Sequence, residues 1–153
     1  METEVINFYS TREKHGCFSN FSAHKIFLKN KTWATTEHYF QAQKFPDTEH
    51  EEEVRLANSP KIAAELGRDR TKPLRKDWET VKDSIMREAL VAKFTQHEDL
   101  KQILLETNDA TLVEHTKNDA YWGDGGDGSG KNMLGKLLME VRAELRPEIT
   151  EIK

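Results

Sequence analysis

The chain has 153 residues and a net charge of −4, with 33% of its residues charged and 36% hydrophobic. This length and composition suit one soluble globular domain, and the acidic balance gives no general electrostatic attraction to nucleic acid or anionic membranes. The single cysteine, Cys17, excludes an intrachain disulfide, and no stretch approaches the ~18 apolar residues of a membrane span. We therefore expect a cytoplasmic protein without a signal or transit peptide.

Hydrophobic spacing and turn residues predict a mostly helical structure with a few short strands. Strands are predicted at 5–9 and 111–115, together with a hairpin over 25–33 that turns at Asn30. Start and stop signals predict helices at 36–45, 48–57, 60–66, 77–94, 98–107 and 132–145. Thr48 and Glu51 have the spacing of a capping box at the start of the second helix. No repeat or linker divides the chain, so we predict a single α+β domain over residues 1–153, with its core at about 5–146.

Residues 36–45, Thr-Glu-His-Tyr-Phe-Gln-Ala-Gln-Lys-Phe, form the most informative stretch. On a helix that advances about 100° per residue, Glu37, Gln41 and Lys44 fall within roughly 60° of each other, and most of the remaining surface is aromatic. A helix that is apolar nearly all round is buried, and a buried acid and amine need partners or shifted pKa values. This polar stripe is therefore either the wall of a pocket or a buried Glu–Lys pair without chemistry.

Two further segments are candidates for binding an anion. Segment 68–76 is basic and contains Arg68 and Arg70, so it is either a solvated loop or a phosphate site. Six of the eight glycines lie within residues 123–135, where dinucleotide and phosphate-loop motifs match only in part. No hydrophobic strand precedes these glycines, and Asn132 stands where a phosphate loop has its magnesium-binding Ser or Thr. A glycine loop before a helix can still present backbone N–H groups to an anion, so we favour ligand binding over a simple connector.

Several motifs occur together in the order found in one known family. They are Phe-Ser-Asn-Phe at 18–21, the 36–45 stretch, Leu-Gly-Arg at 66–68, Asp-Trp at 77–78, Ala-Lys-Phe at 92–94, Trp-Gly-Asp-Gly at 122–125 and Asn-Met-Leu-Gly-Lys-Leu-Leu-Met at 132–139. With these motifs the chain resembles the NADAR domain. It resembles more closely the short bacterial members of the YbiA type, the riboflavin-biosynthesis-intermediate N-glycosidases. The resemblance covers residues 6–145 and is specific, because several long segments match in register.

The resemblance implies a hydrolase that cleaves the N-glycosidic bond between ribose 5-phosphate and aminopyrimidine intermediates of riboflavin biosynthesis. The family also contains members that remove ADP-ribose from guanine in nucleic acid, which is the first alternative for this chain. A non-catalytic ADP-ribose or nucleotide-binding module is the second alternative. The expected partner is thus a small phosphoribosyl substrate or an ADP-ribosylated guanine nucleotide or nucleic acid, with no membrane and no obligate protein partner. No metal or redox cofactor is needed, and no histidine lies at zinc-ligand spacing from a cysteine or a second histidine.

Matching the family's functional residues motif by motif assigns the catalytic roles to Glu37, Asp119 and Lys44. Ribosyl C–N cleavage passes through an oxocarbenium-like state that carboxylates can serve, but the resemblance leaves open which carboxylate acts on water and which on the sugar or leaving group. Lys44 either acts as an ammonium, neutralising Glu37 or holding phosphate, or attacks the ring-opened sugar as a neutral amine. The predicted substrate-binding residues are Asn20, Gln41, Arg68, Arg70, Trp78, Trp122, Gly123 and Asn132.

Overall fold

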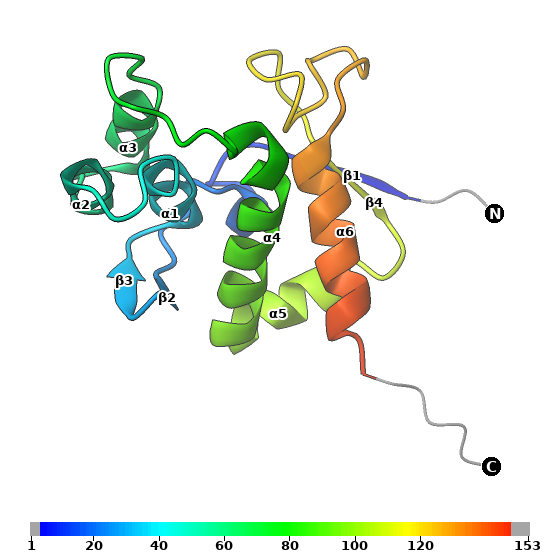
Figure 1. The fold of residues 1–153 in the computed structure, drawn as a ribbon. Helices are drawn as coiled ribbons and strands as arrows, with labels where there is room; N and C mark the ends of the chain where they lie inside the picture. The colour runs from blue at the N-terminus through cyan, green and yellow to red at the C-terminus, as the bar shows by residue number, and fades with distance from the viewer. Residues whose placement is uncertain (1–3, 148–153) are drawn as a thin grey trace.

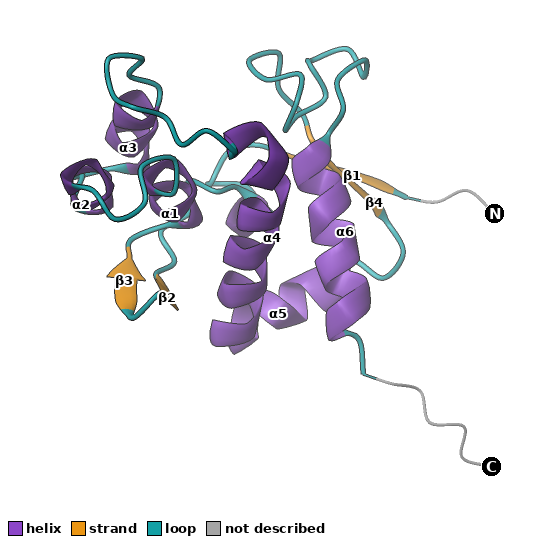
Figure 2. Cartoon of the chain, in the orientation of Figure 1, coloured by secondary structure: helices purple, strands orange, loops and turns teal. Residues whose placement is uncertain are grey.

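The elements of the structure follow the predicted order closely. The computed structural model describes residues 4–147, so the predicted domain ends at 1–3 and 148–153 lie outside the described residues. The elements are β1 (Val5–Phe8), the 3-10 helix η1 (Gly16–Phe18), β2 (Ile26–Leu28), β3 (Lys31–Trp33), α1 (Thr36–Ala42), α2 (Glu49–Arg55), α3 (Pro60–Gly67), α4 (Trp78–Gln96), α5 (Glu98–Leu105), β4 (Thr111–Glu114) and α6 (Met133–Leu145). The mostly helical α+β fold is confirmed (Figure 2).

The long helix α4 lies at the centre of the molecule (Figure 1). Helix α6 packs along one side of α4, and α1 packs on the other side together with α2 and α3. Helix α5 crosses near the C-terminal ends of α4 and α6, while β4 contacts α6. Within residues 4–147, no helix has the combination of length and apolar character that crossing a membrane requires.

Local signals in the sequence explain where several elements begin. The side chain of Thr35 accepts a hydrogen bond from the His38 backbone N–H and so caps α1, and Ser59 caps α3 in the same way ahead of Pro60. In the β2–β3 hairpin, Lys29 and Asn30 both have positive φ angles, 55° and 62°. Two left-handed residues give the turn that matches the twist of a tight hairpin.

The predicted capping box at the start of α2 does not form. Thr48 is the N-cap residue, but its hydroxyl donates to the Phe45 carbonyl at 2.7 Å instead of capping the helix. Glu51 Oε1 accepts from the backbone N–H of Asp47 at 2.9 Å, one residue ahead of the N-cap, while Gln43 and Lys29 donate to Oε2. Glu51 therefore reaches back along the chain as its spacing suggests, but the reciprocal contact from Thr48 is missing.

The N-terminal strand pairs with a strand from late in the chain. Strands β1 and β4 are parallel, with Val5 opposite Thr111 and Phe8 opposite Glu114. The connection between them includes helices α1 to α5. This pairing brings the segment after β1 beside the loop that follows β4.

Helix α1 lies between two apolar clusters, which explains its apolar circumference. Tyr39 and Ala42 belong to a cluster with α2, α3 and the hairpin, whereas Phe40 belongs to the main core around α4, α5 and α6. A helix buried on both sides needs apolar residues on both sides. The polar stripe faces the space that remains between the clusters.

Helix α6 approaches strand β4 closely at Gly135. A β-carbon at this position would lie 2.0 Å from the Leu112 carbonyl oxygen and 2.5 Å from the Asn132 side-chain nitrogen. Gly135 therefore permits α6 and β4 to meet, and it holds the start of α6 against the strand that ends at Glu114.

Candidate active site

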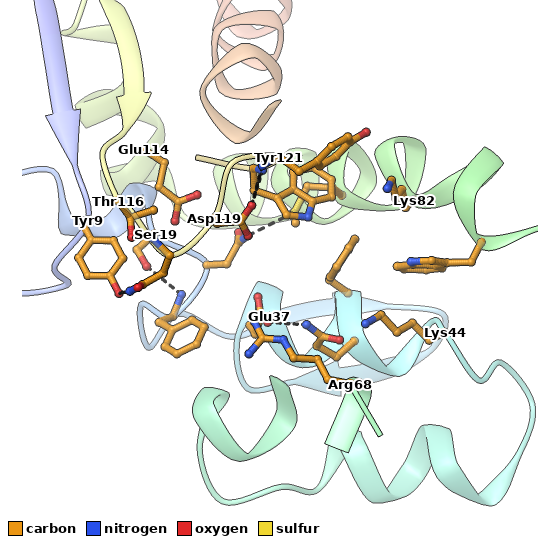
Figure 3. Close-up of a pocket in the computed structure, with 18 residues that line it drawn as sticks. Tyr9, Ser19, Glu37, Lys44, Arg68, Lys82, Glu114, Thr116, Asp119 and Tyr121 are labelled. Atoms are coloured by element: carbon orange, nitrogen blue, oxygen red, sulfur yellow. Dashed lines mark hydrogen bonds between the residues drawn. The ribbon is translucent and has the colours of Figure 1, made fainter. Parts of the chain in front are cut away.

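A pocket of about 360 Å³ opens beside the polar stripe of α1 (Figure 3). Its walls come from segment 19–21, helix α1, the first turns of α4, and the loop after β4. Its volume falls within the range typical of small-molecule sites, roughly 300–1,000 Å³. The structure brings together eight of the predicted site residues in its lining: Asn20, Glu37, Gln41, Lys44, Arg68, Trp78, Asp119 and Trp122.

Glu37 places a carboxyl group in the buried part of this pocket. The residue is 7% exposed, and its Oε2 accepts a hydrogen bond of 2.7 Å from Gln41 Nε2. Burial raises the pKa of Glu37; the Gln41 N–H, Arg68 and Lys44 oppose this rise, and Asp119 adds to it. The carboxyl group thus has one fixed donor and a free edge toward the pocket.

Lys44 lies just beyond the end of α1 and is not paired directly with Glu37. Its Nζ donates to the Gly67 carbonyl at 3.2 Å and lies 5.7 Å from the centre of the Trp78 ring. Burial lowers the pKa of Lys44 to about 8, and the charges of Arg68 and Arg70 act in the same direction against that of Glu37. At pH 7, one unit below this pKa, roughly a tenth of the amine is therefore neutral, far more than for an unperturbed lysine.

Asp119 enters the pocket from the loop after β4. Its Oδ1 accepts hydrogen bonds from the backbone N–H groups of Tyr121, at 2.9 Å, and Trp122, at 2.8 Å. These two bonds fix the orientation of the carboxylate and also the path of the loop. Figure 3 shows Asp119 on the wall of the pocket opposite Glu37.

Aromatic rings in tilted and edge-to-face contact form an apolar part of the pocket. The ring centre of Phe40 lies 5.0 Å from that of Trp78 and 5.3 Å from that of Trp122, and Trp122 lies 4.9 Å from Tyr121. Trp78 is 5% exposed and packs in the main core. From the sequence, Trp78 could either stack on the base of the substrate or anchor the core, and the structure gives it both a core contact and a place in the pocket lining.

Segment 19–22 is held in place by buried polar contacts. Asn20 accepts a hydrogen bond from the Thr36 hydroxyl at 2.8 Å. Below the segment, the fully buried Lys93 donates to the Ser19 carbonyl at 3.0 Å and to the Ser22 hydroxyl at 2.7 Å, and burial lowers its pKa to about 7. Lys93 does not line the pocket, so it supports the segment that presents Asn20.

A second cavity of about 470 Å³ adjoins the first and is rich in basic residues. Lys44, Arg68 and Trp78 line both cavities, while Arg70 lines only the second. Lys72 also lines it, but its Nζ is paired with Glu53 at 3.0 Å. The basic segment after α3 therefore borders the site, which the sequence left undecided between a solvated loop and a phosphate site.

The glycine-rich loop differs from the predicted anion site. The backbone N–H groups of residues 129–132 all donate to acceptors within the loop, and those of 133 and 134 donate to the carbonyls of Tyr121 and Trp122. Gly123 and Asn132 are outside the pocket lining. The Asn132 side chain instead accepts from the Glu114 N–H and donates to the Leu112 carbonyl. The loop is a folded connector that carries Asp119 and Trp122.

Sequence reasoning missed Glu114, which lines the pocket at the end of β4. Burial, together with the neighbouring carboxylates of Asp119, Glu37 and Asp124, raises the pKa of Glu114 to about 7. The available signal was an acidic residue at the end of a predicted strand, just ahead of the loop with Asp119. Within the described residues, no three His, Cys, Asp or Glu side chains are arranged to hold a metal ion.

Comparison with known proteins identifies the family. The model of the NADAR domain matches residues 7–146. The chain belongs to the NADAR family. The NMR structure of the NADAR protein YbiA from E. coli is similar to this one with a TM-score of 0.88 and 61% identity, covering 95% of this chain and 86% of that one.

Curated relatives in the NADAR family carry enzyme names. N-glycosidase YbiA of Escherichia coli (strain K12) is 60% identical over 148 residues, covering 97% of this chain and 92% of the relative. N-glycosidase Npun_R5314 of Nostoc punctiforme is 48% identical, covering 93% of each. The Riboflavin biosynthesis protein PYRR, chloroplastic, of Zea mays is 41% identical over 94% of this chain, which spans 26% of that relative. This NADAR protein is thus an N-glycosidase, a hydrolase acting on N-glycosyl bonds, and the predicted family is confirmed.

Proposed function

We propose that the protein hydrolyses the C–N bond between ribose 5-phosphate and aminopyrimidine intermediates of riboflavin biosynthesis. The observation that carries this proposal is an acidic pocket that continues into a basic cavity through Lys44 and Arg68. A phosphoribosyl amine needs both environments, because its reacting carbon gains positive charge while its phosphate is anionic. The names of two relatives, Riboflavin biosynthesis protein PYRR and Riboflavin biosynthesis protein VVA0006, support this substrate class.

The phosphate is assigned to the basic side of the site. Arg68 and Arg70 have no carboxylate within ion-pair distance among the described residues, unlike Lys72. Free guanidinium groups bind phosphate through paired, charge-assisted hydrogen bonds. With the phosphate near Arg68, the ribose lies over the Glu37 and Asp119 side of the pocket, and the base can stack on the aromatic wall formed by Trp78, Phe40 and Trp122.

Glu37 and Asp119 serve the reacting carbon in this arrangement. As the C–N bond stretches, positive charge develops at the sugar, and a carboxylate within a poorly hydrated pocket stabilises it more strongly than water does. A carboxylate can also accept the proton of the attacking water. Glu37, which is buried and oriented by Gln41, is suited to both tasks at the floor of the pocket.

A direct comparison of two substrates tests the proposal. Wild-type, Glu37→Gln and Lys44→Ala proteins are supplied with a 5-phosphoribosylaminopyrimidine and with an ADP-ribosylated guanine oligonucleotide, and release of free base or ADP-ribose is followed. We expect preferential turnover of the aminopyrimidine, lost in Glu37→Gln. Preference for the oligonucleotide would overturn the substrate assignment, and turnover of neither would overturn the proposal for both classes.

Removal of ADP-ribose from guanine is the second candidate, and Lys44 is the observation that favours it. A lysine with a pKa of about 8 can attack C1 of the ring-opened sugar, where the bond to the guanine nitrogen breaks and guanine leaves with a proton. The resulting C=N bond between the sugar and the lysine is then hydrolysed by water, which releases ADP-ribose and the free amine. Borohydride would then trap the sugar on the protein. Mapping of the adduct to Lys44, with Lys82 of the same pocket as an internal control, would support this candidate, whereas turnover without an adduct would oppose it.

Two substitutions of Asp119 separate the effect of its negative charge from its effect on the geometry of the loop. We expect Asp119→Asn to keep an oxygen that accepts from Tyr121 and Trp122, and so to unfold at a similar temperature while losing about 10²-fold in kcat. Asp119→Ala removes the acceptor as well and should destabilise the protein by a further ~1–2 kcal/mol. Kinetics and thermal unfolding of the two variants check this, and equal kcat in Asp119→Asn and wild type would contradict a role for the charge.

A further inference from the structure

Glu114 is a third carboxyl group in the pocket and has no assigned role. It ends strand β4, where its backbone N–H donates to Asn132 Oδ1 at 3.0 Å and its carbonyl accepts from the Asp124 N–H at 2.9 Å. Its position is thus fixed on both sides of the backbone, while its side chain faces the pocket with Glu37 and Asp119 (Figure 3). A rigid backbone with a free carboxyl group is suitable for delivering a proton at a defined place.

The surroundings of Glu114 contrast with those of Glu37. Among the described residues, no N–H or O–H group donates to the Glu114 carboxyl, and the charged groups that act on it are all acidic: Asp119, Glu37 and Asp124. Asp124 is itself paired with His115 at 2.8 Å. Glu37 has the Gln41 N–H and the positive charges of Arg68 and Lys44 nearby. These contacts favour the neutral acid at Glu114 and give the ionised form of Glu37 partners that Glu114 lacks.

Gln41 holds Glu37 in a fixed orientation. Its Nε2 donates to Glu37 Oε2 at 2.7 Å, and its Oε1, which has no hydrogen-bond partner among the described residues, is buried against Gly67, where a β-carbon would lie 2.1 Å from it. Glu37 therefore has a fixed hydrogen-bond donor that stabilises its ionised form, and the Glu114 carboxyl has none.

We propose that Glu114 is the general acid that protonates the leaving base, an assignment that rests on the proposed hydrolysis of a ribosyl C–N bond. The C1′–N bond breaks with its electron pair passing to nitrogen, and the Glu114 proton is transferred to that nitrogen. Water adds its oxygen to C1′ and gives one proton to Glu37. Return of this proton to Glu114 restores the enzyme, so water is the only co-reactant.

Leaving-group chemistry provides a sharp test, because an amine needs protonation to leave and a nitrophenolate does not. Wild-type and Glu114→Gln proteins are compared on the phosphoribosyl aminopyrimidine and on p-nitrophenyl ribofuranoside 5-phosphate. We expect Glu114→Gln to lose about 10²- to 10³-fold in kcat with the first substrate and less than about threefold with the second. We expect kcat/KM of the wild-type protein to decline as the pH rises through about 7, where the acid form of Glu114 disappears, and this decline to be absent in Glu114→Gln.

Carbon-13 NMR of glutamate-labelled protein supplies a readout that does not depend on turnover. One carboxyl resonance should titrate near pH 7, disappear in Glu114→Gln, and move to lower pH in Glu37→Gln because a neighbouring negative charge is gone. Equal losses on both substrates, or no titration near neutral pH, would overturn the assignment. The wild-type protein could instead cleave the nitrophenyl substrate but not the aminopyrimidine, with Glu114 still titrating near pH 7. That result would overturn the proposed substrate, while the assignment of the proton to Glu114 would stand.

Discussion

Replacing Glu37 with glutamine is expected to lower kcat by about 10³-fold while leaving the protein folded. Glutamine fills the same volume, and its side-chain oxygen can accept the hydrogen bond that Gln41 Nε2 now donates at 2.7 Å. The substitution removes the charge that we propose stabilises the sugar and accepts the proton of water. Because burial raises the pKa of Glu37, the fold loses nothing when this charge is removed at neutral pH.

Steady-state kinetics and thermal unfolding measure the two parts of this expectation. Glu51 provides a matched control, because it is also a buried glutamate, 3% exposed, but lies on α2 away from the pocket. Glu51→Gln weakens the contact with Lys29 and should reduce stability by ~1 kcal/mol with kcat within about twofold of wild type. An active Glu37→Gln protein, or one that has lost its fold, would contradict the role given to the carboxylate.

Gly135→Ala is expected to destabilise the protein by about 3 kcal/mol or more. The added methyl group would lie 2.0 Å from the Leu112 carbonyl oxygen, and this backbone atom cannot move without displacing strand β4 from α6 or from β1. A loss of this size is a large share of the ~5–15 kcal/mol that holds a typical domain together. The midpoint of thermal unfolding should fall by about 10 °C.

Lys136→Ala is the matched control for this substitution. Lys136 is the next residue of α6 and is exposed, so its replacement should change stability by less than ~0.5 kcal/mol. Denaturant or thermal unfolding of both variants gives the comparison. If Gly135→Ala unfolds with the same midpoint as wild type, the close approach of α6 to β4 is not needed for stability.

Local sequence patterns predicted much of the fold and part of the candidate site. The caps at Thr35 and Ser59 and the turn at Asn30 depend on neighbouring residues, so the sequence reveals them directly. The polar stripe of α1 could be predicted because a helix places Glu37 and Gln41 on one face whatever surrounds it. The apolar residues around the rest of this helix correctly indicated that α1 is buried, since α1 has an apolar cluster on each side.

Features that depend on distant packing were not predictable. Glu114 reaches the pocket because β4 pairs with β1 and because α1 packs across from the end of the strand, and no spacing in the sequence encodes that meeting. Glycine content indicated an anion site, but it does not tell whether backbone N–H groups point outward, and here they are used within the loop. At Glu51, the carboxylate is shared between the Asp47 backbone N–H and side chains from other segments, which local spacing alone does not indicate.

The parallel pairing of β1 with β4 has a consequence for how the enzyme is made. Strand β1 emerges from the ribosome before β4, and at about 10 residues per second its partner follows some ten seconds later. Until then Glu37 has neither Glu114 nor Asp119 nearby, and the pocket wall that these residues form does not exist. A nascent chain that stops before the end of β4 therefore has only one wall of the pocket, and we expect it to be inactive.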